Sequence, residues 1–151
     1  MTNDLVTPEN LSVELLNSIF DDAYMETSID SDGDLHVRDD IGCFVILSKD
    51  KDRITLLSQF GFESGATHSQ RLECVNNINK EMIIVKAYVG NNDSLRFEYD
   101  ICLKGGVTKK NIVQATKKFL SIPRAAVINH GEDLVEWATL EHISILKEKS
   151  Q

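Results

Sequence analysis

Residues 82–108, MIIVKAYVGNNDSLRFEYDICLKGGVT, decide the fold class of this chain. In their second half, large apolar residues alternate with mostly polar ones over residues 95–103, which places the apolar side chains on one face of a strand. That pattern is typical of an antiparallel strand with one wet face. Residues 82–89 predict a partner strand, and Gly90 to Asp93 tolerate the backbone of a tight turn. The stretch therefore predicts a β-hairpin.

The end of this stretch predicts a sharp turn followed by a helix. Gly105 and Gly106 let the chain turn off the sheet, and we expect at least one of them in a backbone conformation closed to residues with a Cβ. Thr108 is suited to cap a helix that begins near Lys109, because its hydroxyl can accept a hydrogen bond from a free backbone amide. Gly105, Gly106 and Thr108 are thus predicted to form a structural turn.

The alternation also assigns the two faces of the second strand. We expect Phe97 and Tyr99 to face a core covered by helices, because both belong to the apolar row. Arg96 and Glu98 belong to the polar row, and we expect them to face solvent or a partner.

The first part of the chain divides into elements by its changes of period. Thr7-Pro8-Glu9 predicts the start of a helix that runs to about Glu26. The segment after Thr67 returns to helical spacing and leads into the hairpin. Between these two helices the pattern predicts a three-stranded meander with polar turns, over residues 35–37, 42–48 and 53–60.

The last part of the chain is predicted to be helical. A third helix begins after Thr108 and is stopped by Pro123, and a short helical or irregular piece follows around residues 125–128. Gly131 separates this piece from a last helix, expected over residues 132–147.

The predicted order is α-β-β-β-α-β-β-α-α, an α+β fold in which helices pack on a five-stranded antiparallel sheet made of the meander and the hairpin. We expect one domain over residues 1–151, in which residues 124–151 form a C-terminal helical extension.

Composition and charge narrow the classes of partner. The 16 basic and 24 acidic residues give a net charge of -8, which repels a phosphate backbone, so we expect no nucleic-acid partner. No apolar run is as long as a membrane span requires, and the first ten residues lack the pattern of a signal peptide, so we expect a cytoplasmic protein without a membrane partner. Cys43, Cys74 and Cys102 lie in apolar patterns and are predicted to be buried, reduced thiols.

Six short motifs stand out along the chain. They are Asp32-Gly33-Asp34-Leu35, Gly42-Cys43-Phe44, Val75-Asn76-Asn77-Ile78-Asn79, the strand with Lys86, Tyr99-Asp100 and Gly105-Gly106-Val107-Thr108. Together they resemble the YbjN-like family of bacterial sensory transduction regulators over roughly residues 11–120. The resemblance implies a fold similar to that of type III secretion chaperones and a role in protein binding. It implies no catalytic residues and names no partner.

Two motifs suggest ion binding, and a structural role is favoured for each. Asp30, Asp32 and Asp34 alternate like the ligands of a calcium loop, but the glycine lies at the fourth position and Ile41 stands where such a loop has glutamate. We expect a solvated turn that enters a strand. The Gly105–Thr108 turn precedes a helix and could bind an anion, but it lacks the spacing of a P-loop or a dinucleotide fingerprint.

The remaining candidates for chemistry also favour structural interpretations. Histidines 36, 68, 130 and 142 have no metal-ligand spacing, and a pairing of Cys43 or Cys74 with His68 is no more than chance would give. We therefore expect no catalytic residues, no cofactor and no metal. Asn76, Asn77 and Asn79 end a helix just before a strand, where amide side chains are expected to satisfy backbone groups rather than to bind a ligand.

Two classes of function remain. The first is a non-enzymatic protein-binding module, a chaperone-like or regulatory adaptor with a protein partner that the sequence does not identify. The alternative is a small-molecule-binding or enzymatic domain whose site cannot be found from residue spacing. We also expect a homodimer, because apolar residues cover most of the circumference of the last helix and one sheet cannot cover them all. The candidate protein-interface residues are Leu134, Trp137, Leu140 and Ile143.

Overall fold

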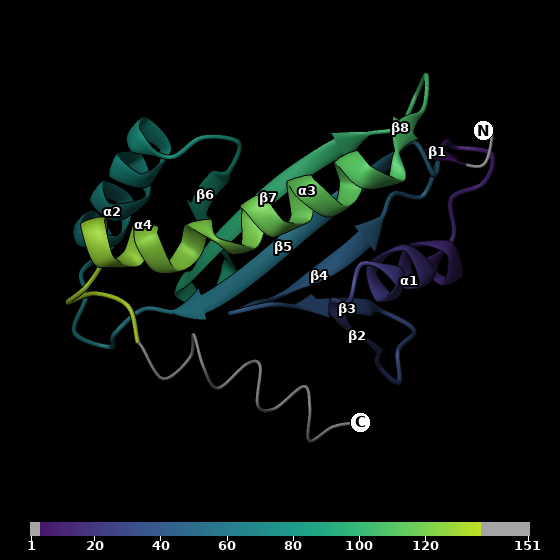
Figure 1. Ribbon diagram of the computed structural model, residues 1–151. Helices are drawn as coiled ribbons and strands as arrows, with labels where there is room; N and C mark the ends of the chain where they lie inside the picture. Colours follow the sequence, from purple (N-terminus) through teal and green to yellow (C-terminus); the bar gives the residue numbers. More distant parts are fainter. Residues whose placement is uncertain (1–3, 137–151) are drawn as a thin grey trace.

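The computed structural model describes residues 4–136, and its centre is an antiparallel sheet with the strand order β2-β3-β4-β5-β7-β6 (Figure 1). The meander and the hairpin predicted from the sequence are confirmed, but the prediction of five strands is wrong, because this sheet has six. Two further short strands form a separate sheet, in which β1 (Leu5–Val6) pairs with β8 (Val107–Thr108). The strands of the large sheet are β2 (Glu26–Ile29), β3 (Leu35–Arg38), β4 (Gly42–Leu47), β5 (Arg53–Gly61), β6 (Lys86–Val89) and β7 (Ser94–Cys102).

The sixth strand is β2, where the sequence pattern predicted no strand and placed only Glu26, its first residue, at the end of the first helix. That helix, α1 (Val13–Asp22), begins later and ends earlier than predicted. Ser12 caps it by accepting a hydrogen bond from the amide of Leu15 at 3.0 Å, whereas residues 8–10 form a turn. After α1 the chain reverses through Tyr24, whose φ of 62° is a left-handed conformation that ends helices. This reversal frees Glu26–Ile29 to pair with β3.

The second and third helices begin where the sequence predicted, and α4 begins a few residues earlier than the piece expected there. Thr67 and Gln70 form a complete capping box at the start of α2 (His68–Glu81). Thr108 caps α3 (Lys109–Leu120) by accepting from the amide of Asn111 at 3.0 Å. Pro123 lies in the first turn of α4 (Ile122–His130), so it separates two helices as expected. The piece expected around residues 125–128 is thus part of a regular helix.

All three residues of the predicted structural turn have the conformations expected of them. Gly105 and Gly106 have φ angles of 87° and 88°, which side chains with a Cβ rarely adopt. Together with the cap at Thr108, they carry the chain from β7 through β8 into α3.

The hairpin is shorter on its first side than predicted. Only Lys86–Val89 pair with β7, and residues 82–85 leave the sheet at Ile84, which has a φ of 60°. The edge is closed instead by Asn79 of α2. Its side-chain amide donates to the carbonyl of Ala87 at 2.9 Å, and its oxygen accepts from the amide of Ala87 at 2.8 Å. The structural role predicted for this asparagine is confirmed.

The core lies between the sheet and the helices that cover one of its faces. Figure 1 shows α3 along β7 and β5, α4 continuing the row toward α2, and α1 beside β2 and β3. Phe97 is fully buried and packs edge-on against Phe60, with ring centroids 5.9 Å apart. Tyr99 points to the same side but is only half-buried. Cys43 and Cys74 are buried as predicted, whereas Cys102 is exposed on the opposite face, so its predicted burial is wrong.

The described chain ends in a turn and a single β-bridge. Residues 131–134 form the turn, and Val135 then bridges to Phe62, so the helix expected from Glu132 does not begin there. The rest of that predicted helix, with Trp137, Leu140 and Ile143, lies outside the described residues. Within residues 4–136, no helix has the length and apolarity that crossing a membrane requires.

Candidate functional site

The face of the sheet opposite the helices carries one continuous row of paired residues across all six strands. The register of each strand pair places these side chains on the same face. The row has an apolar centre, and its polar members lie toward the two edges. It runs Ser28, His36, Phe44, Leu57, Glu98 and Lys86. We call this side of the sheet the open face.

Half of the open face is a groove with an apolar floor. The groove has a volume of about 1160 Å³, and the strands that line it are β2, β3, β4 and β5. Phe44, Ile46 and Leu57 form its floor, and Ile46 is 41% exposed. Tyr24 lies at its rim and is 98% exposed. Large apolar and aromatic side chains that face solvent together are typical of a binding surface. We call this concavity the open-face groove.

One end of the open-face groove holds a pair formed by His36 and Asp30. His36 is buried in β3, its ring lies 4.0 Å from the ring of Phe44, and its Nε2 lies 2.8 Å from Oδ2 of Asp30. This hydrogen bond, together with backbone bonds from Asp34 and Asp32, lowers the pKa of Asp30 to about 2. Asp30 therefore stays ionised at neutral pH and fixes the orientation of the imidazole.

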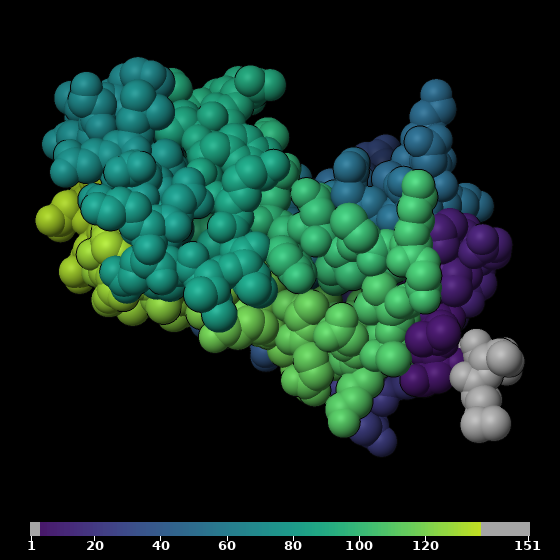
Figure 2. All heavy atoms as spheres, turned by 90° about the horizontal axis from the view of Figure 1, so that it is seen from above, coloured from purple at the N-terminus to yellow at the C-terminus, as the bar shows by residue number. Residues whose placement is uncertain are grey.

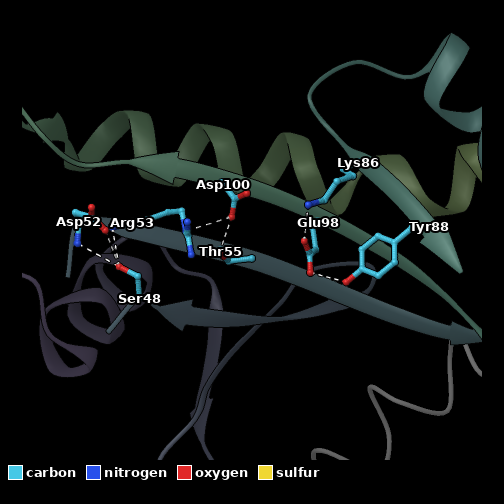
Figure 3. Close-up of polar contacts among 8 residues, drawn as sticks. All are labelled: Ser48, Asp52, Arg53, Thr55, Lys86, Tyr88, Glu98 and Asp100. Carbon is cyan, nitrogen blue, oxygen red and sulfur yellow. Dashed lines mark hydrogen bonds and ion pairs between the residues drawn. The ribbon is translucent and has the colours of Figure 1, made fainter. Parts of the chain in front are cut away.

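The other half of the open face is polar and carries ion pairs, as Figure 3 shows. Glu98 accepts a hydrogen bond from the hydroxyl of Tyr88 at 2.6 Å and lies 3.2 Å from Nζ of Lys86. The bond to Glu98 raises the pKa of Lys86. Asp100 accepts from the hydroxyl of Thr55 and faces Arg53. As predicted, Glu98 lies away from the core, on the face available to solvent or a partner.

The polar half lies between two regions of the molecule that protrude beyond the sheet. Seen from above, the molecule is hollowed between the teal region of α2 and β6 and the blue region around the turn that joins β4 to β5 (Figure 2). That turn is held by Ser48, whose hydroxyl donates to Asp52 at 3.0 Å and accepts from the amide of Arg53 at 3.1 Å (Figure 3). The open face is therefore concave in shape as well as mixed in chemistry.

The aspartate motif forms a tight turn between β2 and β3. Carboxylate oxygens of Asp30, Asp32 and Asp34 lie within 4.8 Å of one another, and of the groups searched in residues 4–136 this is the set close enough to share a cation. Oδ1 of Asp30 already accepts from the amides of Asp32 and Asp34, each at 3.0 Å. This is the hydrogen bonding of an Asx turn, which agrees with the predicted turn into a strand.

The glycine turn lies beside a cavity of about 580 Å³. Glu9, Asp50 and Asp52 line this cavity and face a single lysine, Lys104. This excess of carboxylates disfavours the anion site that the turn alone could have formed.

The two buried thiols are poorly suited to nucleophilic chemistry. Burial raises the pKa of Cys43 to about 12 and that of Cys74 to about 11. Both side chains therefore remain protonated at neutral pH. Because a cysteine nucleophile reacts as the thiolate, neither thiol is in its reactive form.

Sequence reasoning named different residues as the candidate protein interface. Of these, only Leu134 is described. Its side chain is half-buried against the core, and its carbonyl accepts a hydrogen bond from the amide of Glu63 at 2.6 Å. Both the side chain and the backbone of Leu134 therefore make contacts within its own chain. The floor of the open-face groove was missed, although a signal was present. Residues 43–47 of β4 are apolar at every position, so both faces of that strand carry apolar side chains.

Comparisons with known proteins agree with this fold. The family model YbjN, described as "Putative bacterial sensory transduction regulator", matches residues 12–126. A crystal structure described as "YbjN, a putative transcription regulator from E. coli" superposes with a TM-score of 0.70 at 15% sequence identity. It covers 83% of this chain and 96% of its own. At this identity the likeness concerns the fold alone. A search of curated proteins finds no match.

Proposed function

Because this chain belongs to the YbjN family, described as regulatory, we propose that it is a cytoplasmic, non-enzymatic protein-binding module that holds a partner polypeptide on its open face. It acts as a chaperone-like or regulatory adaptor. The observation that carries this proposal is the open-face groove, with Phe44, Ile46 and Leu57 on its floor and Tyr24 at its rim. An apolar centre surrounded by polar and charged groups is the usual anatomy of a protein interface.

The groove suits an amphipathic segment of a partner. Its apolar floor can receive the apolar side of such a segment, while the neighbouring polar half of the sheet can pair with the segment's polar side. Tyr24 supports this, because it lines the groove, is exposed, and belongs to a residue type that is enriched among the residues that dominate binding energy.

The charges of the open face support a protein partner over nucleic acid. Arg38, Arg53 and Lys86 each lie within 4.0 Å of a carboxylate of the same face. Basic residues paired in this way attract a phosphate backbone less strongly than free ones. The protonated state of Cys43 and Cys74 supports a role without covalent catalysis.

Affinity capture from bacterial cytosol tests the proposal. The intact tagged chain is compared with Leu57→Asp, which places a charge on the groove floor, and with the control Ile128→Asp. Ile128 is 52% exposed on α4 and does not line the groove. We expect Leu57→Asp to reduce the capture of specific proteins by about tenfold or more, as the loss of a central contact does. Equal capture by both variants in quantitative mass spectrometry would refute a groove-bound partner.

Small-molecule binding is a second candidate, favoured by the concavity of the groove and the oriented His36 at its end. Native mass spectrometry of the protein purified under mild conditions tests it. A bound mass that is present in the wild type and absent from Leu57→Asp would favour this candidate over a protein partner.

Self-association through Trp137, Leu140 and Ile143 is a further proposal, which rests on the sequence. Sedimentation equilibrium at micromolar concentration, with the intact chain and Trp137→Ala, tests it. A monomeric intact chain would rule it out, and a dimer that Trp137→Ala does not weaken would place the interface elsewhere.

A further inference from the structure

The described chain ends beside the open-face groove. Residues 134–136 lie along residues 61–63, just beyond the paired part of β5. The amide of Glu136 donates to the carbonyl of Gly61 at 2.9 Å, and the amide of Glu63 donates to the carbonyl of Leu134 at 2.6 Å. Because β7 pairs with the other edge of β5 as far as Gly61, residues 134–136 lie on the edge that faces β4.

The direction of the chain at this point leads toward the groove. Val135 pairs with Phe62 in the antiparallel sense, so the chain runs back along β5 as it passes Glu136. The next open-face residue of β5 in that direction is Gln59, which lines the groove. Glu136 therefore lies at the end of the groove that Gln59 lines, and residues 137–151 continue the chain from that point.

The length of this segment is sufficient to cross the groove. From β5 to β2 there are three gaps between strands, which amount to about 14 Å at the usual strand separation. Even in an α-helix, which rises about 1.5 Å per residue, residues 137–151 would extend about 22 Å. No rearrangement of the described residues is needed for the segment to reach β2.

The segment changes from apolar to charged residues along its length, and the groove changes from an apolar floor at β5 and β4 to charged residues at its far end. The first ten residues of the segment include Trp137, Leu140 and Ile143, and its last five include Lys147 and Lys149, with Glu148 between them. The floor formed by β4 and β5 is apolar, whereas carboxylates predominate at the far end. These belong to Asp21, Asp34 and Glu26, the last of which lies 3.7 Å from Arg38. A segment that begins at β5 places apolar groups on the apolar floor and brings its lysines to this acidic end.

As the alternative to self-association through Trp137, Leu140 and Ile143, we propose that residues 137–151 occupy the open-face groove of their own chain. This inference rests on the groove assigned above as the partner site, and it adds that a partner must displace the chain's own C-terminal segment in order to bind. The segment then competes with any partner for the groove, so the apparent affinity of a partner is lower than its affinity for the empty groove.

The full-length chain supplies its own probe for this contact. Trp137 is the single tryptophan of the sequence and begins the segment, so its fluorescence reports whether the segment is covered. Acrylamide quenching of the wild type is compared with that of Ile46→Lys and Leu57→Lys on the groove floor, and of Ile128→Lys on α4 as the control. Circular dichroism and urea midpoints identify any variant that fails to fold. Because Ile46 is 41% exposed, its substitution is the milder of the two groove changes.

The expected result is a wild-type Trp137 that is quenched several-fold less than N-acetyltryptophanamide. Folded Ile46→Lys and Leu57→Lys should approach the free compound, while Ile128→Lys should match the wild type. Three results would overturn the inference. They are a wild type quenched like the free compound, protection that neither groove variant changes, and protection lost on dilution from micromolar to nanomolar protein, which would assign the segment to a second copy. The experiment uses no partner, so it can fail while groove-dependent capture succeeds, and the reverse.

Discussion

Asn79 is predicted to hold the edge strand β6 in place, and its replacement by alanine gives the sharpest test of the fold. Its side chain makes two hydrogen bonds to the backbone of Ala87, at 2.8 and 2.9 Å. Ala87 is buried, whereas Asn79 is exposed, so the bonds are partly buried and a net value relative to water applies to each. At about 1 kcal/mol for each hydrogen bond, the lost contacts amount to about 2 kcal/mol.

Asn76→Ala is the matched control, because Asn76 is exposed on the same helix. Both substitutions gain about 0.5 kcal/mol from the better helix propensity of alanine, so the gain cancels when the variants are compared. We expect Asn79→Ala to be less stable than Asn76→Ala by about 2 kcal/mol, which corresponds to about 4–8 °C in Tm for a chain of this size.

Urea unfolding of the two variants measures this difference directly, and hydrogen exchange locates it. The amide of Ala87 should exchange faster in Asn79→Ala, whereas amides at the centre of β5 should change only with global stability. Equal urea midpoints for the two variants would refute the assigned role of Asn79, as would unchanged protection of the Ala87 amide.

Three further predictions concern the core, the glycine turn and the response to acid. Phe97→Ala should lower the free energy of unfolding by about 3–5 kcal/mol, because Phe97 is 0% exposed, and a loss below about 1 kcal/mol in urea unfolding would contradict its place in the core. Gly105→Ala and Gly106→Ala should each cost about 1 kcal/mol or more, with the larger loss at Gly106, where an added Cβ would lie 3.1 Å from Leu5; a reversed order of midpoints would contradict this. The pKa of Asp30 is lowered from 3.8 to about 2 in the folded protein, so its contribution to stability is complete above about pH 4 and is lost as the pH falls toward about 2. Asp30→Asn should therefore show a shallower loss of stability across that range, and an unchanged slope would contradict the assignment.

The sequence predicted best those elements that local residues determine. The cap at Thr108 and the glycines at 105 and 106 depend on neighbours within a few positions, and all three were predicted correctly, whereas the helix start predicted at Thr7-Pro8-Glu9 was wrong. The strand β7 followed from the alternation of apolar and polar residues, and the meander followed from short strand-like runs separated by polar turns. The failures lie where tertiary contacts decide. β2 consists of Glu26–Ile29, whose mixed composition has no apolar alternation, and it becomes a strand because Tyr24 reverses the chain beside β3.

The candidate site was harder to predict than the fold, because it combines residues from separate strands. Phe44 and Leu57 become neighbours through the pairing of β4 with β5, and His36 joins them through the pairing of β3 with β4. Spacing along the chain does not contain this register. What the sequence did contain was a strand with apolar residues on both faces, residues 43–47, which places apolar side chains on the open face as well as in the core.

The similarity to the solved structure concerns the sheet and the helices that cover it, and it does not extend to the side chains of the open face. The helices cover one face of the sheet and bury the core, and this arrangement survives in a structure with only 15% sequence identity. Side chains on the open face are not needed to bury that core, so two chains can share the fold and still differ completely in what they present there. Under the function proposed above, residues such as Ile46, Leu57 and Tyr24 specify the partner, and substitutions at these positions should change binding much more than stability.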